Sequence, residues 1–355
     1  ANNKLLKVKI VDKVVLVTGA GGSIGSELSR QILYLKPKKL ILFEVSEAAL
    51  YQIERDLNEI SKSDIEILPV LGSVRYFSKL ESTFKQYGVQ TVYHAAAYKH
   101  VPLVEHNQSE GVLNNAIGTW RAAEAAIASK VETFVLISTD KAVRPTNTMG
   151  ASKRVSELIL QGLSKNQNIT CFTMVRFGNV LDSSGSVIPL FKKQIESGGP
   201  VTVTDKNIVR YFMTVQESVE LVIQAGAMGK GGDVFVLDMG SPVLINDLAK
   251  KIIRLSGLQV KDKLNPNGDI EIQYVGLRPG EKLYEELLVG GNVSKTENSL
   301  IMRAEETMID WKLLKHTLVE LEEVSINLQN KRVRDILVKL VPEFDPKSPS
   351  NIELK

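Results

Sequence analysis

Residues 14–25 of the chain read VVLVTGAGGSIG, a β-branched run that passes directly into a glycine-rich turn. The run Val14–Thr18 predicts a buried strand, and the helical pattern from Ile24 onward predicts that a helix follows. Glycines at 19, 22 and 25 permit a tight turn, close approach of a pyrophosphate, and close packing of the helix on the strand. The N–H groups at the start of that helix would face the phosphates. This strand–turn–helix context predicts a dinucleotide site that includes Gly19, Gly22, Ser23, Ile24 and Gly25.

The same alternation of strands and helices continues beyond the turn. Short apolar runs predict six buried strands: Val14–Thr18, Leu40–Glu44, Ile65–Val70, Thr91–His94, Phe134–Ser138 and Cys171–Phe177. Helix-length stretches lie between them: Ile24–Leu35, Glu47–Ile60, Val74–Tyr87 and Asn114–Ser129. Such alternation forms a parallel sheet with helices on both faces. The predicted fold class is therefore α/β, a doubly wound Rossmann-type sheet whose ligand crevice lies at the carboxyl ends of the strands.

The alternation stops after Phe177. Loops rich in glycine and serine, such as those at 182–187 and 229–232, separate shorter elements there. A helix is predicted at Ile245–Leu255 and a long helical stretch at Trp311–Leu340. We expect residues 1–180 to form the dinucleotide-binding Rossmann domain, with a return of the chain to it around 212–240 left open. Residues 181–345 are expected to form mainly a smaller C-terminal substrate-binding cap, and residues 346–355 a tail.

Bulk composition argues against several classes of protein. The 355 residues carry 44 Lys and Arg against 41 Asp and Glu, so no overall charge favours nucleic acid or a membrane surface. No uncharged apolar run reaches the roughly 18 residues that a membrane helix needs, so no membrane contact is expected from this segment. The single cysteine, Cys171, excludes an internal disulfide and indicates a reducing, cytoplasmic compartment. The chain begins with Ala1 and not with Met, which leaves open an upstream segment that anchors it to the inner membrane.

The histidines and the single cysteine form no cluster with metal-ligand spacing, so no catalytic metal is expected. We expect a homo-oligomer, whose size the sequence leaves open.

Glu44 points to the identity of the dinucleotide. It ends the second predicted strand, where an acidic residue binds the hydroxyls of the adenosine ribose. Its carboxylate would repel a 2′-phosphate and no Arg follows it at 45–48, so NAD is favoured over NADP. The other expected cofactor contacts are Ser73 and Val74 after the third strand, and the small residues Ala95, Ala96 and Ala97 after the fourth.

Six further motifs follow the turn in a fixed order: YHAAAYKHVP at 93–102, NNAIGT at 114–119, STDKAV at 138–143, MGASKR at 149–154, RFGNV at 176–180 and RPGEK at 278–282. Together with the TGxxGxxG turn, they resemble the extended short-chain dehydrogenase/reductase family. Within it they resemble the nucleoside-diphosphate-sugar dehydratases of polysaccharide biosynthesis, specifically UDP-N-acetylglucosamine 4,6-dehydratases. The resemblance spans about residues 10–345. It implies an NAD-dependent lyase that makes a UDP-2-acetamido-2,6-dideoxy-4-hexulose for bacterial surface glycans or glycoproteins.

One position departs from the pattern of the wider family. That family uses Tyr-x-x-x-Lys, in which the tyrosine takes the proton of the sugar hydroxyl, whereas this chain has Met149 at the Tyr position and retains Lys153. The spacing puts both on one helix face, but methionine cannot accept a proton in this role. The chain resembles a subset of the sugar dehydratases that carry the same Met, retain the configuration at C5 and have membrane helices attached to the catalytic domain. We therefore expect an active enzyme.

The resemblance also implies roles for the polar residues of the predicted crevice. Asp140 would protonate the leaving C6 hydroxyl, and Lys141 would remove the C5 proton if desolvation or Lys153 lowers its pKa. Thr139 would bond the C4 oxygen and relay its proton, while Lys153 would hold the nicotinamide ribose and add positive potential near C4.

The expected partner is a UDP-sugar, bound by Lys99, His100, Asn179, Arg210, Arg278 and Glu281. Arginine forks match diphosphate oxygens, and Glu281 would accept from the uridine ribose. Two other functions remain open. A UDP-sugar 4-epimerase shares the fold, the NAD and the first hydride transfer, and a non-catalytic dinucleotide-sensing module would tolerate Met149.

Overall fold

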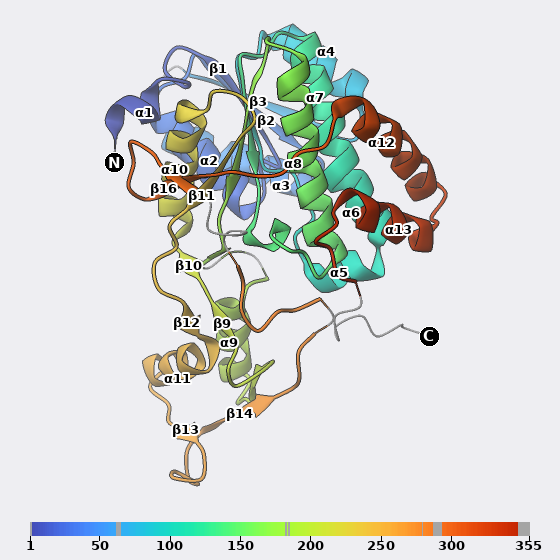
Figure 1. Cartoon of the computed structure of the whole chain (residues 1–355). Coiled ribbons are helices and arrows are strands. Elements are labelled where there is room, and N and C mark those ends of the chain that lie inside the picture. Colours follow the sequence, from blue (N-terminus) through green and yellow to red (C-terminus); the bar gives the residue numbers. More distant parts are fainter. Residues whose placement is uncertain are drawn as a thin grey trace.

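The computed structural model describes residues 2–61, 65–181, 183, 185–278, 280–286 and 293–346. Its central feature is a nine-stranded sheet in the order β15-β16-β11-β6-β5-β4-β1-β2-β3 (Figure 1). The bounds are β1 Val14–Thr18, β2 Lys39–Glu44, β3 Glu66–Leu71, β4 Thr91–His94, β5 Thr133–Ile137, β6 Cys171–Arg176, β11 Asp233–Leu237, β15 Val293–Lys295 and β16 Ile301–Ala304. All six predicted strands are present, so the predicted α/β Rossmann-type fold is confirmed.

From β3 to β11 in that order, every neighbouring pair of strands is parallel. The carboxyl ends of β1, β4, β5 and β6 therefore lie at one edge of the sheet, where the glycine turn and the 138–143 motif follow their strands. At the other end of the sheet, β16 runs antiparallel to β11, and β15 runs antiparallel to β16. The sheet thus places the glycine turn and the 138–143 segment at the same edge, with β4 between their two strands.

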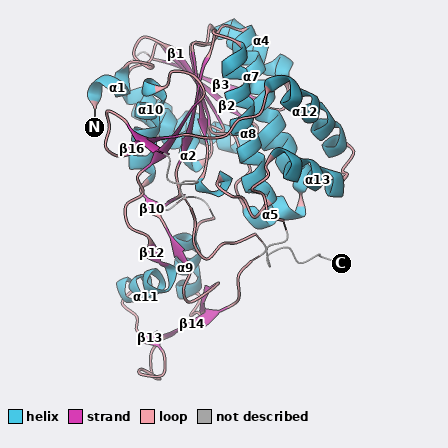
Figure 2. Ribbon diagram, in the orientation of Figure 1, coloured by secondary structure: helices cyan, strands magenta, loops and turns pink. Residues whose placement is uncertain are grey.

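Helices cover both faces of the sheet (Figures 1 and 2). One layer holds α1 Asn3–Lys7, α2 Ser23–Tyr34, α3 Glu47–Ile60 and α10 Val215–Met228. The other holds α4 Phe77–Tyr87, α6 Gln108–Val112, α7 Gly118–Ala128, α8 Thr148–Asn166, α12 Trp311–Ile326 and α13 Asn330–Leu340. Alternate residues of a strand supply the two cores, since Leu16 packs in one and both Val15 and Val17 in the other. Among the described residues, no helix is long and apolar enough to cross a bilayer.

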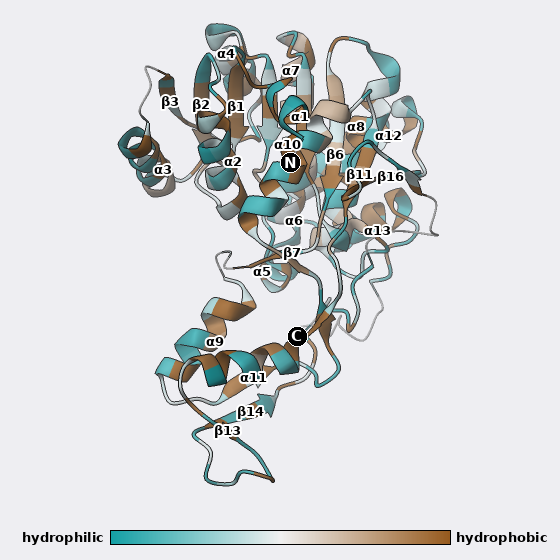
Figure 3. Ribbon diagram, turned by 90° about the vertical axis from the view of Figure 1, so that its left-hand side faces the viewer, coloured by the Kyte–Doolittle hydropathy of each residue, from teal (hydrophilic) through white to brown (hydrophobic). Residues whose placement is uncertain are grey.

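A smaller unit lies beyond the carboxyl edge of the sheet (Figure 3). It contains α9 Val187–Glu196, β8 Val201–Val203, β9 Val209–Arg210, β12 Val243–Leu244, α11 Ile245–Leu255, β13 Val260–Lys261 and β14 Ile270–Tyr274. Its own core includes Phe191, Ile195, Val201, Ile253 and Ile270. The pair β7 Asn179–Val180 and β10 Phe212–Met213 lies where the two units meet.

The chain returns to the large unit twice after residue 180. The segment 215–237 forms α10 and β11, the return that the sequence left open around 212–240, and residues 293–346 form β15, β16, α12 and α13. The predicted helical stretch Trp311–Leu340 is two helices, divided at Leu328 with a φ of 55°. Both helices pack on α8 and α6, because their apolar faces complete the core of the large unit. The cap is therefore smaller than expected.

Candidate active site

The glycine turn has the shape that a phosphate cradle requires. Gly19 has a φ of +64°, and a Cβ atom there would lie 2.8 Å from the backbone nitrogen of Ala96. At Gly25 a Cβ atom would collide with the carbonyl oxygen of Gly19. Helix α2 begins at Ser23 with Gly22 as its N-cap, and glycine has no side chain with which to cap the first turn. A backbone packed this closely, open at a helix N-terminus, fits the pyrophosphate of a dinucleotide.

Glu44 lies beside this turn and already holds part of it. Its buried carboxylate accepts hydrogen bonds from the backbone N–H groups of Gly21 at 3.0 Å, Val45 at 2.9 Å and Ser46 at 3.0 Å. The side chain therefore fixes the position of the turn relative to β2, besides its predicted contact with the ribose.

A chain of hydrogen bonds under the site has a defined direction. Thr119 donates to the carbonyl of Asn115 at 2.6 Å, so its oxygen must accept from His94 Nε2 at 3.1 Å. Burial and the nearby Lys153 lower the pKa of His94 to about 3, so the ring is neutral. Its Nδ1 then accepts from Thr18, 2.8 Å away. These hydrogen bonds join the ends of β1 and β4 to the helical segment that carries Asn115 and Thr119.

The segment after β5 is compact and charged. Asp140 is 1% exposed, and its Oδ1 accepts from the Thr139 hydroxyl at 2.9 Å and from Lys141 Nζ at 3.0 Å. Its Oδ2 is buried without a hydrogen-bond partner among the described residues and faces Gly178. Asp140 itself does not line the cleft, and its carboxylate is linked to the cleft through Thr139 and Lys141, which do.

Lys141 does not meet the condition that its predicted role requires. Burial alone would lower its pKa, but the carboxylates of Asp140 and Glu285 raise the pKa above its usual value. The ammonium form is therefore favoured, which corrects the expectation that desolvation or Lys153 makes Lys141 partly neutral. The sequence did not indicate Glu285 as a neighbour of Lys141.

Lys153 and Met149 come from the buried helix α8, and both side chains line the cleft. Lys153 Nζ donates to the carbonyl of Ile137 at 2.6 Å. Burial, opposed by the Glu157 carboxylate, lowers the pKa of Lys153 to about 8. Met149 is 3% exposed and therefore contributes an apolar patch where the wider family has a hydroxyl.

The smaller unit and its connections bring three further predicted residues to the cleft. Arg210 is bonded to Glu281 at 3.2 Å and to backbone carbonyls, so its guanidinium is already partly engaged. Glu281 also accepts from the backbone N–H of Arg278 at 3.1 Å. Arg278 itself is exposed at the cleft. Pro279 of the same motif lies outside the described residues.

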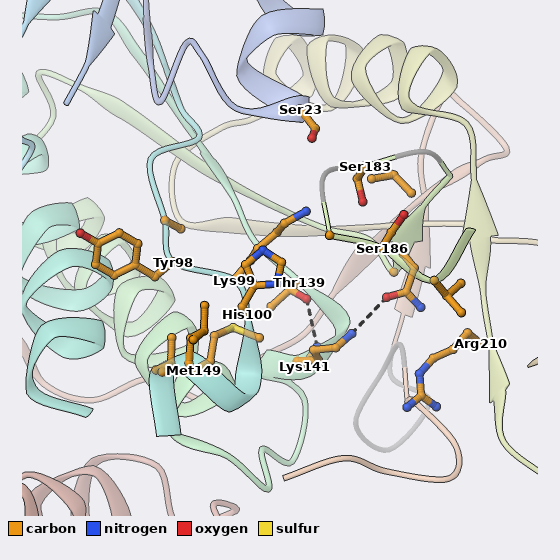
Figure 4. Close-up of a pocket in the computed structure, with 18 of the residues that line it drawn as sticks. Ser23, Tyr98, Lys99, His100, Thr139, Lys141, Met149, Ser183, Ser186 and Arg210 are labelled. Atoms are coloured by element: carbon orange, nitrogen blue, oxygen red, sulfur yellow. Dashed lines mark hydrogen bonds between the residues drawn. The ribbon is translucent and has the colours of Figure 1, made fainter. Parts of the chain in front are cut away.

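These groups line a single cleft of about 830 Å³ (Figure 4). The predicted residues in its wall are Gly22, Ser23, Ile24, Gly25, Ala95, Ala97, Lys99, His100, Thr139, Lys141, Met149, Lys153, Asn179, Arg210, Arg278 and Glu281. Six others are not in the wall: Gly19, Glu44, Ser73, Val74, Ala96 and Asp140. Gly19 and Ala96 pack beneath the phosphate turn, and Val74 is core. Among the described residues no group of His, Cys, Asp and Glu could hold a metal ion.

An apolar wall on the cap side was missed by the sequence analysis. The apolar side chains that line the cleft together with Thr139 and Met149 are Leu190, Phe191, Ile208, Phe212 and Ile245. The amphipathic pattern of Val187–Glu196 was the available signal, since α9 exposes one face and buries another. Lys99 and His100 are exposed at the cleft, but partial desolvation by their surroundings lowers the pKa of each side chain, and Lys99 adds to the effect on His100. A Cβ atom at Gly185 would lie 2.5 Å from the His100 ring.

Comparison with known proteins gives a consistent result. The family model described as "Polysaccharide biosynthesis protein" matches residues 15–306. The capsular polysaccharide biosynthesis protein CapD of Staphylococcus aureus is 52% identical over 284 residues, which cover 80% of this chain and 46% of that protein. The chain thus spans about half the length of CapD. A UDP-glucose 4-epimerase of Rickettsia akari is 34% identical over 296 residues, 81% of both chains.

Solved structures agree with the fold. The structure of Pen from Bacillus thuringiensis matches with a TM-score of 0.74 and 32% identity, covering 88% of this chain and 99% of that one. DesIV, a dTDP-glucose 4,6-dehydratase from Streptomyces venezuelae solved with NAD and TYD bound, matches with a TM-score of 0.65 and 21% identity over 77% of this chain and 88% of that one. At that identity the likeness concerns the fold alone.

Proposed function

The chain belongs to the polysaccharide biosynthesis protein family, and from this premise we propose that it is an NAD-dependent 4,6-dehydratase of UDP-N-acetylglucosamine. The observation that carries the proposal is the buried Asp140, which accepts hydrogen bonds from Thr139 and Lys141, two residues that line the same cleft as the glycine turn. A dehydratase needs an acid at the leaving hydroxyl, which an epimerase does not need.

The cradle supports a bound dinucleotide. Gly22, Ser23, Ile24 and Gly25 would hold the pyrophosphate, Glu44 the adenosine ribose and Lys153 the nicotinamide ribose. NAD, when bound, supplies the acceptor for hydride from C4 and returns it to C6.

The side chains supply the proton transfers. Thr139 would accept a hydrogen bond from the C4 hydroxyl, and its own proton already points at Asp140 Oδ1, which provides a route for the C4 proton. Asp140, once it holds that proton, would pass it to the C6 oxygen, which leaves as water. Lys141 would first lose its ammonium proton to solvent, then remove the C5 proton as the neutral amine and later return a proton to C5, and its raised pKa in the free enzyme sets the cost of the first loss.

The cap side suits a nucleoside-diphosphate sugar. Arg278 is exposed at the cleft and would meet the diphosphate as a bidentate fork, with Arg210 behind it. Lys99, His100 and Asn179 would contact the sugar, and the apolar wall from α9 would pack on the base or the acetyl group.

The test is the path of a hydrogen label. Protein supplied with NAD and UDP-N-acetylglucosamine should form a product lighter by one water. Deuterium placed at C4 should be recovered at C6, and reaction in heavy water should add one deuterium at C5. Loss of the C4 label to solvent would contradict the proposed mechanism.

The second candidate is a UDP-sugar 4-epimerase. The similarity to the Rickettsia epimerase over most of both chains favours it. An epimerase would return the label to C4 and release no water, so one experiment separates the two. A dinucleotide sensor would move no label.

A further inference from the structure

Five charged side chains meet at the wall of the cleft: Asp140, Lys141, Arg210, Glu281 and Glu285. They come from three parts of the chain, namely the segment after β5, strand β9 and the described segment 280–286. Glu285 has no role in the chemistry proposed above, although its side chain is only 4% exposed. A buried carboxylate with no assigned role needs a physical reason.

The surroundings of Lys141 show what Glu285 does. Three oxygens surround Lys141 Nζ: Asp140 Oδ1 at 3.0 Å, Asn179 Oδ1 at 3.5 Å and Glu285 Oε1 at 3.7 Å. An ammonium group has three N–H bonds and no lone pair, so it suits three acceptors. A neutral amine would direct its lone pair at one of these oxygens. The arrangement therefore favours the ammonium form.

Glu285 is the member of this set that can be changed without touching the reacting atoms. It is not among the residues that line the cleft, so it acts on a bound substrate through the two lining residues that it contacts, Lys141 and Arg210. Its Oε1 lies 3.9 Å from Arg210 Nε on its other side, and its buried Oε2 has no hydrogen-bond partner among the described residues. Its charge is thus shared between two cations.

We propose that Glu285 is a positioning residue for Lys141, whose ammonium form it holds beside Asp140, and that it thereby controls when Lys141 is available as a base. The inference rests on the proposed function for the role of the base, but the ion pair itself is a property of the free protein. The charges that face Lys141 are Asp140 and Glu285, which raise its pKa, and Arg210, which opposes them.

The direct test measures Lys141 without any turnover. A limiting amount of acetic anhydride labels only neutral amines, and peptide mass spectrometry then compares Lys141 with an exposed lysine of the same sample. In Glu285→Gln the labelling of Lys141 at neutral pH should rise about tenfold, because one close carboxylate charge is lost. Glu285→Asp keeps the charge and should stay closer to the wild type.

The adjacent Glu286 supplies a matched control. It is more exposed and pairs with Arg144 at 3.0 Å and Lys282 at 3.6 Å, away from Lys141. Glu286→Gln removes the same charge one residue later and should leave the labelling of Lys141 unchanged. Circular dichroism and the Tm confirm that each variant is folded before labelling.

Unchanged labelling of Lys141 in folded Glu285→Gln would overturn the inference. If labelling rises, the pH profile of kcat gives the second readout, and the limb that reports the base should move to lower pH. A rise in labelling with an unmoved limb would establish the Glu285–Lys141 coupling and refute Lys141 as the C5 base. Failure of the inference and failure of the proposed function are thereby distinguished.

Discussion

Lys153 Nζ donates a 2.6 Å hydrogen bond to the carbonyl oxygen of Ile137, which ties the cleft face of helix α8 to the last residue of strand β5. The bond fixes a buried amine one helical turn after Met149, beside the segment that carries Thr139 and Asp140. We therefore expect the site to depend more on the position of the Lys153 amine than on the identity of residue 149.

This arrangement predicts unequal effects of substitution on α8. Met149→Ala should retain appreciable turnover, because the substitution removes only an apolar side chain that takes no part in proton transfer. Lys153→Ala should reduce kcat/KM about a hundredfold or more, the usual scale for removing a positioned electrostatic group. Steady-state kinetics on both variants is the measurement. Equal and complete losses would show that residue 149 participates directly.

The phosphate turn predicts a specific loss of dinucleotide binding. A Cβ atom at Gly22 would lie 3.3 Å from Gly19 O, a tight contact that requires a small shift of the turn, and the branches of Gly22→Val would fill the place of the pyrophosphate. NAD affinity by isothermal titration should fall strongly, whereas Ser26→Val, about one turn along α2, should bind almost normally. Retention of NAD by folded Gly22→Val would refute the assignment of the turn.

Glu44 predicts the choice between the two dinucleotides. The wild type should bind NAD more tightly than NADP, since a buried carboxylate would face the 2′-phosphate. Glu44→Gln should narrow that preference and also weaken the binding of both dinucleotides, because the carboxylate accepts hydrogen bonds from three backbone N–H groups and so holds the turn in place. Titration of both dinucleotides measures the ratio, and a wild-type preference for NADP would reverse our interpretation.

Removing the carboxyl group of Asp140 should stop the reaction before water is lost. Asp140→Asn keeps the shape but can neither take up the C4 proton from Thr139 nor protonate the leaving hydroxyl, so exchange of C5 with heavy water and loss of water should both fall. The overall rate should fall on the order of a hundredfold to ten-thousandfold. Mass spectrometry of the recovered sugar nucleotide separates exchange from elimination. Full dehydration by this variant would remove Asp140 from the mechanism.

A buried ionic network behind the site predicts pH-dependent stability. Glu157 is bonded to Arg176 at 2.6 and 2.7 Å, to Arg154 at 3.0 Å and to Ser138 at 2.7 Å. Burial would raise the pKa of Glu157, but the two arginines lower it to about 2 from an ordinary 4.5. Because the folded pKa is depressed, its stabilisation is present above pH 4.5 and is lost as the pH falls toward 2.

Glu157→Gln should therefore lower the free energy of unfolding by about 3–5 kcal/mol at pH 7, the usual range for breaking a buried pair. The difference from wild type should shrink below pH 4.5, in urea titrations carried to the lowest pH at which both fold. Glu59→Gln removes a carboxylate that is 64% exposed in its pair with Arg55 and should change stability by less than about 1 kcal/mol. Equal effects of the two substitutions would contradict this account.

The sequence predicted the strands well because buried parallel strands need contiguous apolar runs, and Val14–Thr18 and Thr91–His94 have the predicted bounds. The sequence did not predict which helices Trp311–Leu340 packs against, since an amphipathic pattern shows that one face is buried but does not identify the neighbour that covers it. Thr139 and Asn179 follow strands β5 and β6 closely and line the cleft, because the carboxyl ends of parallel strands share one edge of the sheet. The base role of Lys141 was conditional on its pKa, which the adjacent Asp140 raises together with Glu285, and Glu285 lies far along the chain and approaches only in three dimensions.

The two-part origin of the smaller unit has a consequence for how the protein is made. Its core joins Phe191 and Ile195 to Ile253 and Ile270, with α10 and β11 of the large unit synthesised between them. As the ribosome elongates the chain, the first part emerges before its packing partners exist. We expect this interval to be when the nascent chain most needs a chaperone, because its apolar surface stays exposed until the later segment is translated.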